Sequence, residues 1–169
     1  MTKLTTVGIV ERVSIGRRAV DVPAKLDTGA DSSAIWASNI RIGRDGVLRF
    51  SLFGEGSPYY NGKLFKRTVF SVAQVKSSNG QSEVRYRTQF TVTIAGRRIR
   101  ALFNLSDRTN STYKILIGRR TMSGKFLVDV SKGVRRSPSN ARTKQLNRKL
   151  AEGPYDFHQR YVKDKGIIL

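Results

Sequence analysis

The sequence predicts an all-β domain, either a barrel or a sandwich, on three observations. Runs rich in β-branched and aromatic residues are short, and turn signals separate them at close intervals. Two of these turns, Asp45-Gly46 and Asn79-Gly80, carry dipeptides typical of tight hairpins. Residues 84–94 alternate apolar with polar side chains, which is the pattern of a long strand with one buried face.

The first half of the chain supplies the strands that precede this alternating stretch. Pro23 cannot donate a backbone hydrogen bond, so we expect its strand to lie near an edge or to be irregular. The apolar run Ala34-Ile35-Trp36-Ala37 is expected to pack beneath the loop before it. The strands expected in this half are 5–15, 19–26, 40–42, 47–53 and 64–75. The core candidates of the last of these are Val69, Phe70, Val72 and Val75.

The second half continues the pattern. After the alternating strand the chain turns at Ala95-Gly96-Arg97, and Ile99, Ala101, Phe103 and Leu105 are expected to line the return strand. Further strands are expected at 113–118 and 126–130, with a short helical turn within 119–125.

The chain changes character after residue 131. Residues 135–139 are typical of a linker, whereas 140–152 has the composition of a basic helix. Its regularly placed apolar residues, Leu146 and Leu150, are too few for an independent core. We therefore divide the chain into a β-barrel domain at 1–131 and a basic C-terminal extension at 132–169.

Composition limits the partners and the compartment. The 169 residues carry a net charge of +20 and contain no cysteine, so disulfides and thiolate metal sites are excluded. No signal stretch opens the chain and no apolar run is long enough to span a membrane, so we expect a cytoplasmic protein without a membrane partner. The charge indicates an anionic partner or serves solubility.

The candidate catalytic segment is Leu26-Asp27-Thr28-Gly29-Ala30-Asp31-Ser32-Ser33, which follows the strand at 19–26. Glycine lets the chain turn back beside the carboxylate, and Thr28 can hydrogen-bond the backbone of the turn. Such a loop presents one aspartate for acid–base work on water, provided that a second carboxylate is close. On its own the tripeptide is more often an ordinary turn between strands.

A second segment, Ile115-Leu116-Ile117-Gly118-Arg119, changes this balance. An Asp-Thr-Gly-Ala-Asp loop, a glycine-bearing hairpin and then Ile-Leu-Ile-Gly-Arg resemble the retropepsins, the homodimeric aspartic proteases. Within that fold the sequence is most similar to the bacterial family labelled ATP-dependent zinc proteases. The resemblance covers residues 1–130 and not the tail. It implies a closed acid-protease barrel with one lobe per chain and a short helix after Ile-Leu-Ile-Gly-Arg.

The resemblance also implies how the site is built. The chain has one Asp-Thr-Gly copy, so the second carboxylate must come from a twin chain across a two-fold axis. Asp27 of each subunit then activates water, Thr28 bonds across the axis, and Gly29 contacts the substrate backbone. In aspartic proteases two such carboxylates share one proton, because like charges in contact cannot both ionise.

The resemblance assigns further residues to substrate binding. A flap, the hairpin that closes over substrate, is expected to have its tip at Ser77, Ser78, Asn79 and Gly80. Ala30 belongs to the substrate loop, and Asp31 and Arg119 are expected to form a partly buried ion pair within one subunit. The bacterial family usually has a basic residue at the place of Asp31, so this chain follows the retropepsin pattern there.

We predict no cofactor and no metal. Zinc sites use three or four histidine, cysteine or carboxylate ligands, and the only histidine, His158, lies in the tail. The segment Gly118 to Lys125 superficially resembles a phosphate loop, but five residues separate Gly118 from Gly124, whereas a phosphate loop has four between its glycines. Phe126 also stands where serine or threonine should bind magnesium.

Two function classes follow. The first is a homodimeric aspartic endopeptidase, whose substrates the basic charge predicts to be acidic peptides. The second is a non-catalytic basic module that binds RNA or ribosomes and keeps the aspartate loop as a relic. Scattered arginines favour phosphate contacts, but few aromatic residues interleave with them as an RNA-stacking surface requires.

Overall fold

A computed structural model describes residues 4–76, 82–133 and 141–163. The chain divides into two compact units, residues 1–134 and 135–169, and each is described separately. The strands of the first unit are β1 (Thr5–Val7), β2 (Val10–Ile15), β3 (Ala19–Asp27), β4 (Ser33–Ile42), β5 (Leu48–Leu52), β6 (Leu64–Arg67), β7 (Ser71–Lys76), β8 (Ser82–Ile94), β9 (Arg97–Ser106), β10 (Ile115–Gly118) and β11 (Phe126–Val128), with helix α1 (Arg119–Met122) between the last two.

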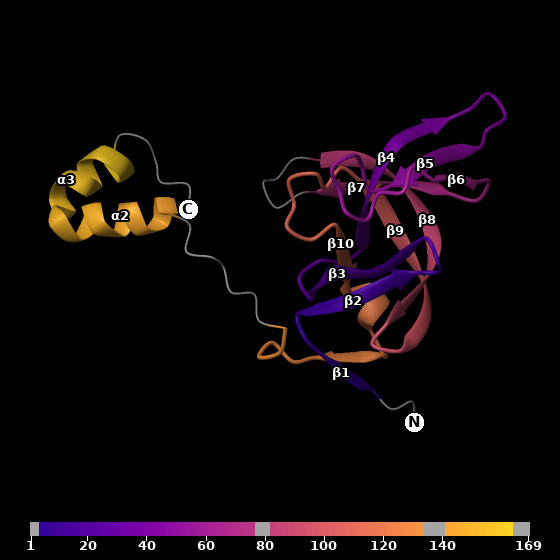
Figure 1. The fold of residues 1–169 in the computed structure, drawn as a ribbon, viewed down its shortest axis with the longest axis horizontal. Coiled ribbons are helices and arrows are strands. Elements are labelled where there is room, and N and C mark those ends of the chain that lie inside the picture. Colours follow the sequence, from indigo (N-terminus) through magenta and orange to yellow (C-terminus); the bar gives the residue numbers. More distant parts are fainter. Residues whose placement is uncertain (1–3, 77–81, 134–140, 164–169) are drawn as a thin grey trace. The chain divides into compact units, whose positions relative to one another are not determined.

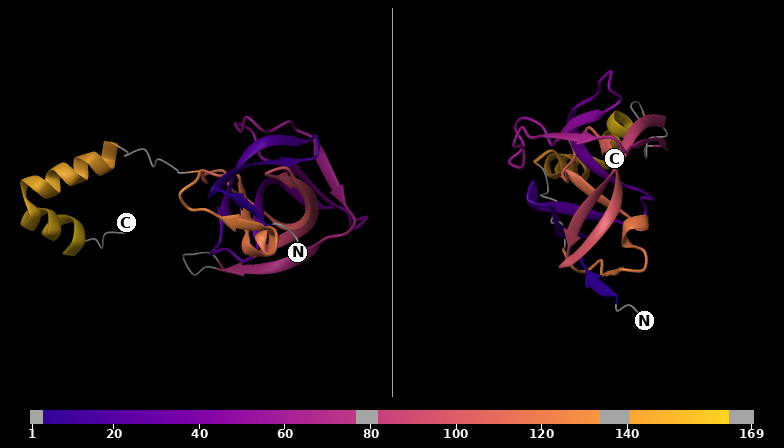
Figure 2. Two further views of the ribbon diagram at one scale, coloured as in Figure 1. Left: turned by 90° about the horizontal axis from the view of Figure 1, so that it is seen from below. Right: turned by 90° about the vertical axis from the view of Figure 1, so that its right-hand side faces the viewer.

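Six of these strands close a barrel in the order β10-β3-β2-β8-β9-β4, because β4 pairs with β10 as well as with β9. The left-hand view of Figure 2 shows this ring nearly end-on. Strands β5 and β6 continue the sheet beyond β4, and β7 pairs with the outer part of β8 (Figure 1). The all-β, retropepsin-like barrel predicted from the sequence is confirmed.

The barrel interior is filled by the inward side chains of the ring. Thr88, Phe90, Val92 and Ile94 of β8 are buried, as the alternating pattern predicts. The return-strand residues Ile99, Ala101, Phe103 and Leu105 are also buried, as is the whole run from Ala34 to Ala37. Four aromatic rings, Phe50, Phe65, Phe90 and Phe103, extend this core toward β5 and β6 in edge and stacked contacts.

Two expected strands are interrupted. The run 5–15 breaks between β1 and β2, where the backbone of Lys132 passes close to Gly8. A Cβ on Gly8 would lie 2.8 Å from the Lys132 carbonyl group, so glycine is required at this crossing. Ile9 N–H donates to that carbonyl at 3.0 Å instead of to a neighbouring strand. The run 64–75 divides into β6 and β7 at residues 68–70.

Two of the four core assignments in that divided run, Val69 and Val72, are wrong. Val69 is 83% exposed and Val72 is 56% exposed, whereas Phe70 is half-buried against Tyr86 and Val75 is half-buried. The reason is that the β7–β8 hairpin projects beyond the barrel, so no second layer covers its faces. Alternation along a strand shows which side chains share a face, but not whether that face is covered.

The strand that contains Pro23 is paired on both sides rather than at an edge, but it is irregular, because Asp21 has a φ of 53° and the β2–β3 register shifts between Val13 and Ile15. Pro23 stands opposite Arg12 of β2, while the pairing of β3 with β10 begins only at Ala24. Proline has no N–H to donate, but no hydrogen bond to β10 is lost at Pro23, because the pairing with β10 begins one residue later.

The second unit is helical. It contains α2 (Ala141–Glu152), α3 (Pro154–His158) and a π-helical turn, η1 (Gln159–Lys163). Helix α2 matches the predicted basic helix, and the rings of Phe157 and Tyr161 are in tilted contact, with 4.7 Å between their centroids. Within the ranges described, no helix has the length and apolar character needed to cross a membrane.

Candidate active site

Asp27 is the last residue of β3, and its position is fixed by the parallel strand beside it. Gly118, the last residue of β10, is its register partner. Beyond Asp27 the chain turns, with Ala30 N–H donating to the Asp27 carbonyl at 3.2 Å. Gly29 N–H donates to carboxylate Oδ1 at 3.1 Å, so the loop itself orients the carboxylate.

The second segment singled out in the sequence holds this loop from behind. Arg119 N–H donates to the Ala30 carbonyl at 2.8 Å, and Arg120 N–H donates to the Asp31 carbonyl at 3.3 Å. A Cβ on Gly118 would lie 2.5 Å from the carbonyl carbon of Ser32, a distance that real side chains do not show. Glycine is therefore required where β10 passes the loop.

Two buried hydroxyls complete this support. Ser33 Oγ lies 2.8 Å from Thr121 Oγ1 and accepts a 3.0 Å hydrogen bond from Gly118 N–H. Ser33 is 1% exposed and Thr121 is 7% exposed, so water cannot replace either partner. The bond therefore ties the Asp27 loop to helix α1 across 88 residues of sequence.

Lys25 is the charged neighbour of Asp27. Its Nζ donates to Asp27 Oδ2 at 3.0 Å. Partial burial on its own would raise the pKa of Asp27, but the hydrogen bond and charge of Lys25 outweigh it, helped by the N–H groups of Gly29 and Ala30. The pKa of Asp27 in the single chain therefore lies below its ordinary value.

Asp31 and Arg119 form the expected ion pair, but it is not buried. Arg119 Nε donates to Asp31 Oδ1 at 2.9 Å, and Arg120 approaches the other carboxylate oxygen at 2.7 Å. The side chains of Asp31 and Arg119 are 44% and 62% exposed. Because Asp31 contacts both arginines, it keeps one cationic partner when the other is removed.

A cleft of about 670 Å³ lies between the Asp27 loop and the β7–β8 hairpin. Gly29, Ala30 and Asp31 line it on the loop side, as expected from the sequence. The expected flap-tip residues Ser77, Ser78, Asn79 and Gly80 lie outside the described residues, but the strands that lead to them line the opposite wall. The lining cations are Lys76, Arg85, Arg87, Arg108 and Arg120.

The cleft contains polar groups that the folded chain leaves unpaired. Arg87 Nε and Asn104 Oδ1 are buried without a hydrogen-bond partner among the described residues. Arg108 Nε donates to the Tyr113 carbonyl at 3.0 Å. Burial lowers the pKa of Arg108, the nearby charge of Arg85 adds to this, and the Asp27 carboxylate opposes it. This side of the cleft is thus rich in donors for an anionic or peptide ligand.

Not all predicted site residues meet the cleft in one chain. Asp27, Thr28 and Arg119 are not among the residues that line it; Asp27 is half-buried and Thr28 is exposed. Within the described ranges no cluster of three histidine or carboxylate side chains could hold a metal ion.

Several residues of the site were not predicted. The position of Lys25 beside Asp27 could have been predicted, because the two residues are two apart on one strand and such residues share a face. The Ser33–Thr121 bond and the position of Arg108 had none, because each depends on strands that are distant in sequence.

Comparison with known proteins gives the family. The model for "Retropepsin-like aspartic endopeptidase RimB" matches residues 6–138. The chain belongs to this RimB-like family. A structure of a Legionella pneumophila protein of unknown function superposes with a TM-score of 0.61 at 25% identity, over 76% of this chain and 95% of that one.

Two curated relatives carry a different name. Proteins of Shewanella pealeana and Shewanella halifaxensis named "Probable alpha-L-glutamate ligase" are 36% and 34% identical over 115 residues. The match covers 65% of this chain but only 25% of each relative, so the chain spans about a quarter of their length.

The buried hydroxyl bond gives a stability prediction. Ser33→Ala leaves Gly118 N–H and Thr121 Oγ1 buried without their partner, so we expect the free energy of unfolding to fall by about 1–3 kcal/mol. Urea denaturation followed by far-UV circular dichroism measures it. Ser32→Ala, the half-buried neighbour, is the matched control and should change stability little. Equal effects of the two substitutions would show that the bond does not hold the loop.

Proposed function

We propose that this RimB-like protein is a homodimeric aspartic endopeptidase in which each subunit contributes Asp27 to one shared site. The observation that carries the proposal is a single, rigidly supported Asp-Thr-Gly loop in a chain of a retropepsin-like endopeptidase family. Aspartic proteases need two carboxylates, and one chain offers one loop of this kind.

The chemistry follows from pairing two such carboxylates. One ionised Asp27 takes a proton from water while the protonated one donates to the peptide carbonyl oxygen. In the single chain Lys25 favours the ionised form. A second carboxylate at the axis opposes that effect, because like charges in contact cannot both ionise, so the pair retains one proton near neutral pH. Thr28 then bonds across the axis and Gly29 contacts the substrate backbone.

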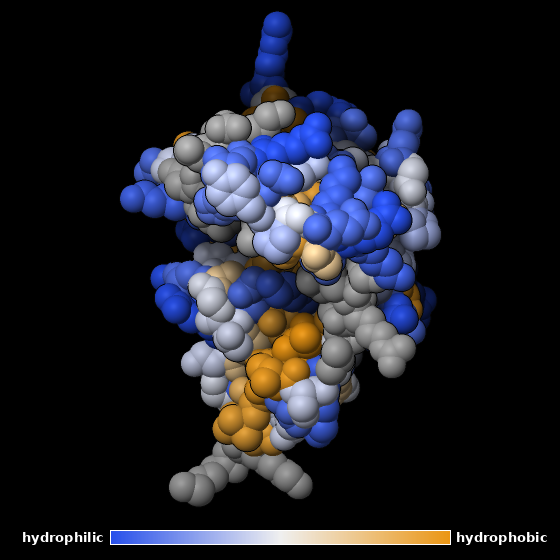
Figure 3. Space-filling model, turned by 90° about the vertical axis from the view of Figure 1, so that its left-hand side faces the viewer, coloured by the Kyte–Doolittle hydropathy of each residue, from blue (hydrophilic) through white to orange (hydrophobic). Residues whose placement is uncertain are grey.

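The surface supports a twin subunit. Thr28 and Gly29 are exposed beside Asp27. Strands β1 and β11 pair only with each other among the described residues, which leaves both outer edges free to pair with another chain. Leu4, Leu127 and Val130 are 41%, 54% and 74% exposed on or beside these strands. Figure 3 shows apolar surface gathered in the lower half of the molecule, the end at which Figure 1 places β1.

The cleft supports an extended, acidic peptide as substrate. Retropepsin-like clefts bind peptide backbones by hydrogen bonds, and Asn104 Oδ1 offers an unpaired acceptor for them. Five cations and one carboxylate, Asp31, line the cleft. Residues 1–130 contain 22 basic and 9 acidic residues, a net charge of about +13 that a dimer doubles. The naming of two longer relatives as glutamate ligases agrees with a glutamate-rich peptide.

The function is tested by removing the carboxylate. Asp27→Asn should abolish peptide cleavage while leaving a folded dimer, because asparagine has nearly the same shape but cannot take a proton from water. Cleavage is followed by mass spectrometry of a peptide library, and the dimer by light scattering. Asp21→Asn is the control, because Asp21 is exposed on the same strand and Asn also tolerates its φ of 53°.

Two results would contradict the proposal. A monomer at micromolar concentration would exclude a shared site. Cleavage that persists in Asp27→Asn would place the chemistry elsewhere. If neither the wild type nor Asp27→Asn cleaves peptides, and both bind RNA with an affinity that falls steeply with salt, the non-catalytic RNA or ribosome module is the correct class.

The substrate preference is tested separately. Acidic peptides should be cleaved with a higher kcat/KM than neutral peptides of the same length, and the advantage should shrink as salt rises, because salt screens the field of the cleft. Measuring kcat/KM at low and high salt checks this. Equal cleavage of acidic and neutral peptides at low salt would end the idea.

A further inference from the structure

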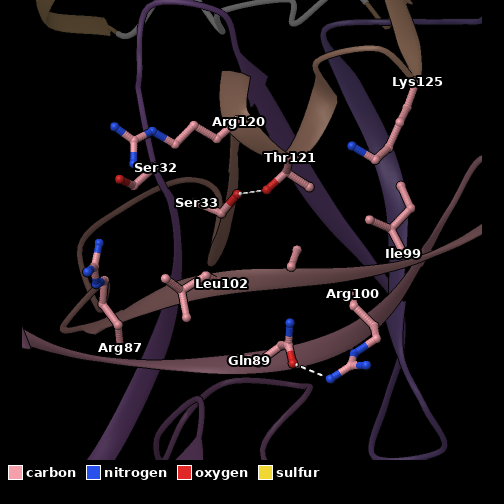
Figure 4. A pocket seen from close by; sticks show the side chains of 11 residues that line it. Ser32, Ser33, Arg87, Gln89, Ile99, Arg100, Leu102, Arg120, Thr121 and Lys125 are labelled. Carbon is pink, nitrogen blue, oxygen red and sulfur yellow. Dashed lines mark hydrogen bonds between the residues drawn. The ribbon is translucent and has the colours of Figure 1, made fainter. Parts of the chain in front are cut away.

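A second basic hollow lies around the corner from the cleft. It has a volume of about 280 Å³ and is bounded by the Ser32-Ser33 segment, the end of α1 with the following turn, and parts of β8 and β9 (Figure 4). Its lining residues are Ser32, Ser33, Arg87, Gln89, Ile99, Arg100, Ala101, Leu102, Arg120, Thr121 and Lys125. Four of them are cations and none is a carboxylate.

The partners of these cations leave positive charge available. Arg100 donates to the neutral amide oxygen of Gln89 at 2.7 Å, as the dashed line in Figure 4 shows, and Lys125 donates to the Ser123 carbonyl at 3.1 Å. Of these four cations, only Arg120 meets a carboxylate within the described ranges, that of Asp31. Arg87 Nε is buried without a partner in the described part of the chain. A buried donor of this kind costs free energy unless a ligand accepts its hydrogen bond.

This hollow adjoins the cleft. Ser32, Arg87 and Arg120 line both spaces. A chain that leaves the cleft on this side therefore passes Arg87 and Arg120 before it reaches Arg100 and Lys125. In Figure 4 Arg87, Ser32 and Arg120 lie on the left of the view, whereas Arg100 and Lys125 lie on the right.

The chemistry of the lining selects the ligand. No aromatic ring from the described part of the chain lines the hollow, so those residues offer no surface on which a nucleobase can stack. Guanidinium and ammonium groups beside short apolar side chains instead match the carboxylate and methylene stem of an acidic residue. The small volume suits one or two such side chains rather than a folded partner.

We propose that this hollow is an outer anion subsite, which binds a carboxylate of the substrate several residues from the bond that is cut. The proposal rests on the proposed peptidase function and extends it. The protease then recognises a run of acidic residues rather than one acidic residue at the cleavage point. The subsite acts on substrate binding and not on the chemical step, because it lies outside the cleft that contains the Asp27 loop.

The test compares two extensions of one cleavable core peptide. One carries four glutamates and the other carries four glutamines, placed in turn at each end. At low salt we expect the glutamate extension at one end to raise kcat/KM about tenfold, through KM, because each charge-assisted contact contributes on the order of a few-fold in affinity. The double variant R100Q/K125Q should reduce that ratio to about one or two.

The matched control is R98Q/K66Q, which removes the same charge from exposed residues that line neither space. It should keep most of the glutamate advantage. If both double variants reduce the ratio equally, only the general field of the protein matters and the subsite does not exist. If wild type cleaves the core peptide but gains nothing from glutamate at either end, the subsite is also excluded.

Other outcomes separate the subsite from the peptidase proposal. If wild type cleaves neither peptide, the proposed function fails, and binding of the two peptides is then compared by fluorescence anisotropy. A glutamate preference in binding that R100Q/K125Q removes would support the subsite alone. If R100Q/K125Q instead weakens binding of an RNA oligonucleotide and leaves both peptides unaffected, the hollow binds nucleic acid and the proposal is overturned.

Discussion

The structure depends on the close passage of β10 behind the Asp27 loop. Gly118 stands beside Asp27 in a parallel pairing, and its lack of a side chain allows the Ser32 backbone to approach within a distance that excludes any Cβ. From that point the N–H groups of Arg119 and Arg120 reach the loop carbonyls. Two sequence segments about ninety residues apart therefore make one rigid support, and the Asp27 carboxylate has a fixed direction as a result.

This rigidity has an electrostatic consequence. A carboxylate that accepts hydrogen bonds from a lysine and from backbone N–H groups is held in its ionised form, as the lowered pKa of Asp27 indicates. An isolated group of this kind is a poor proton donor near neutral pH. In the proposed dimer, a second carboxylate in contact with the first would restore a shared proton, so dimer formation and the effect of Lys25 on Asp27 are coupled.

The sequence predicted those features that local patterns determine. Alternation identified β8 and the inward residues of β9, and residue types at turns identified the Asp27 loop and the segment ending at Gly118. Alternation did not show that the β7–β8 hairpin leaves the barrel, so Val69 and Val72 were wrongly placed in the core. It also did not show that the crossing of Lys132 interrupts the first strand at Gly8.

The basic surfaces could be predicted only as a total. The net charge indicated an anionic partner, but Arg87, Arg108 and Arg120 come together only because three separate segments of the chain meet in space. The same is true of the Ser33–Thr121 bond. Tertiary neighbours of this kind leave no periodic signal, whereas Lys25, two residues from Asp27 on one strand, was predictable from the strand period alone.

Mixing subunits tests the shared site most directly. Wild type and Asp27→Asn are unfolded together, refolded at varied ratios and assayed for peptide cleavage at constant total protein. If each chain supplies one carboxylate, activity should fall with the square of the wild-type fraction, to about one quarter at equal parts, because mixed dimers are inactive. A linear fall, to about one half at equal parts, would show that one chain holds a complete site and would contradict the account.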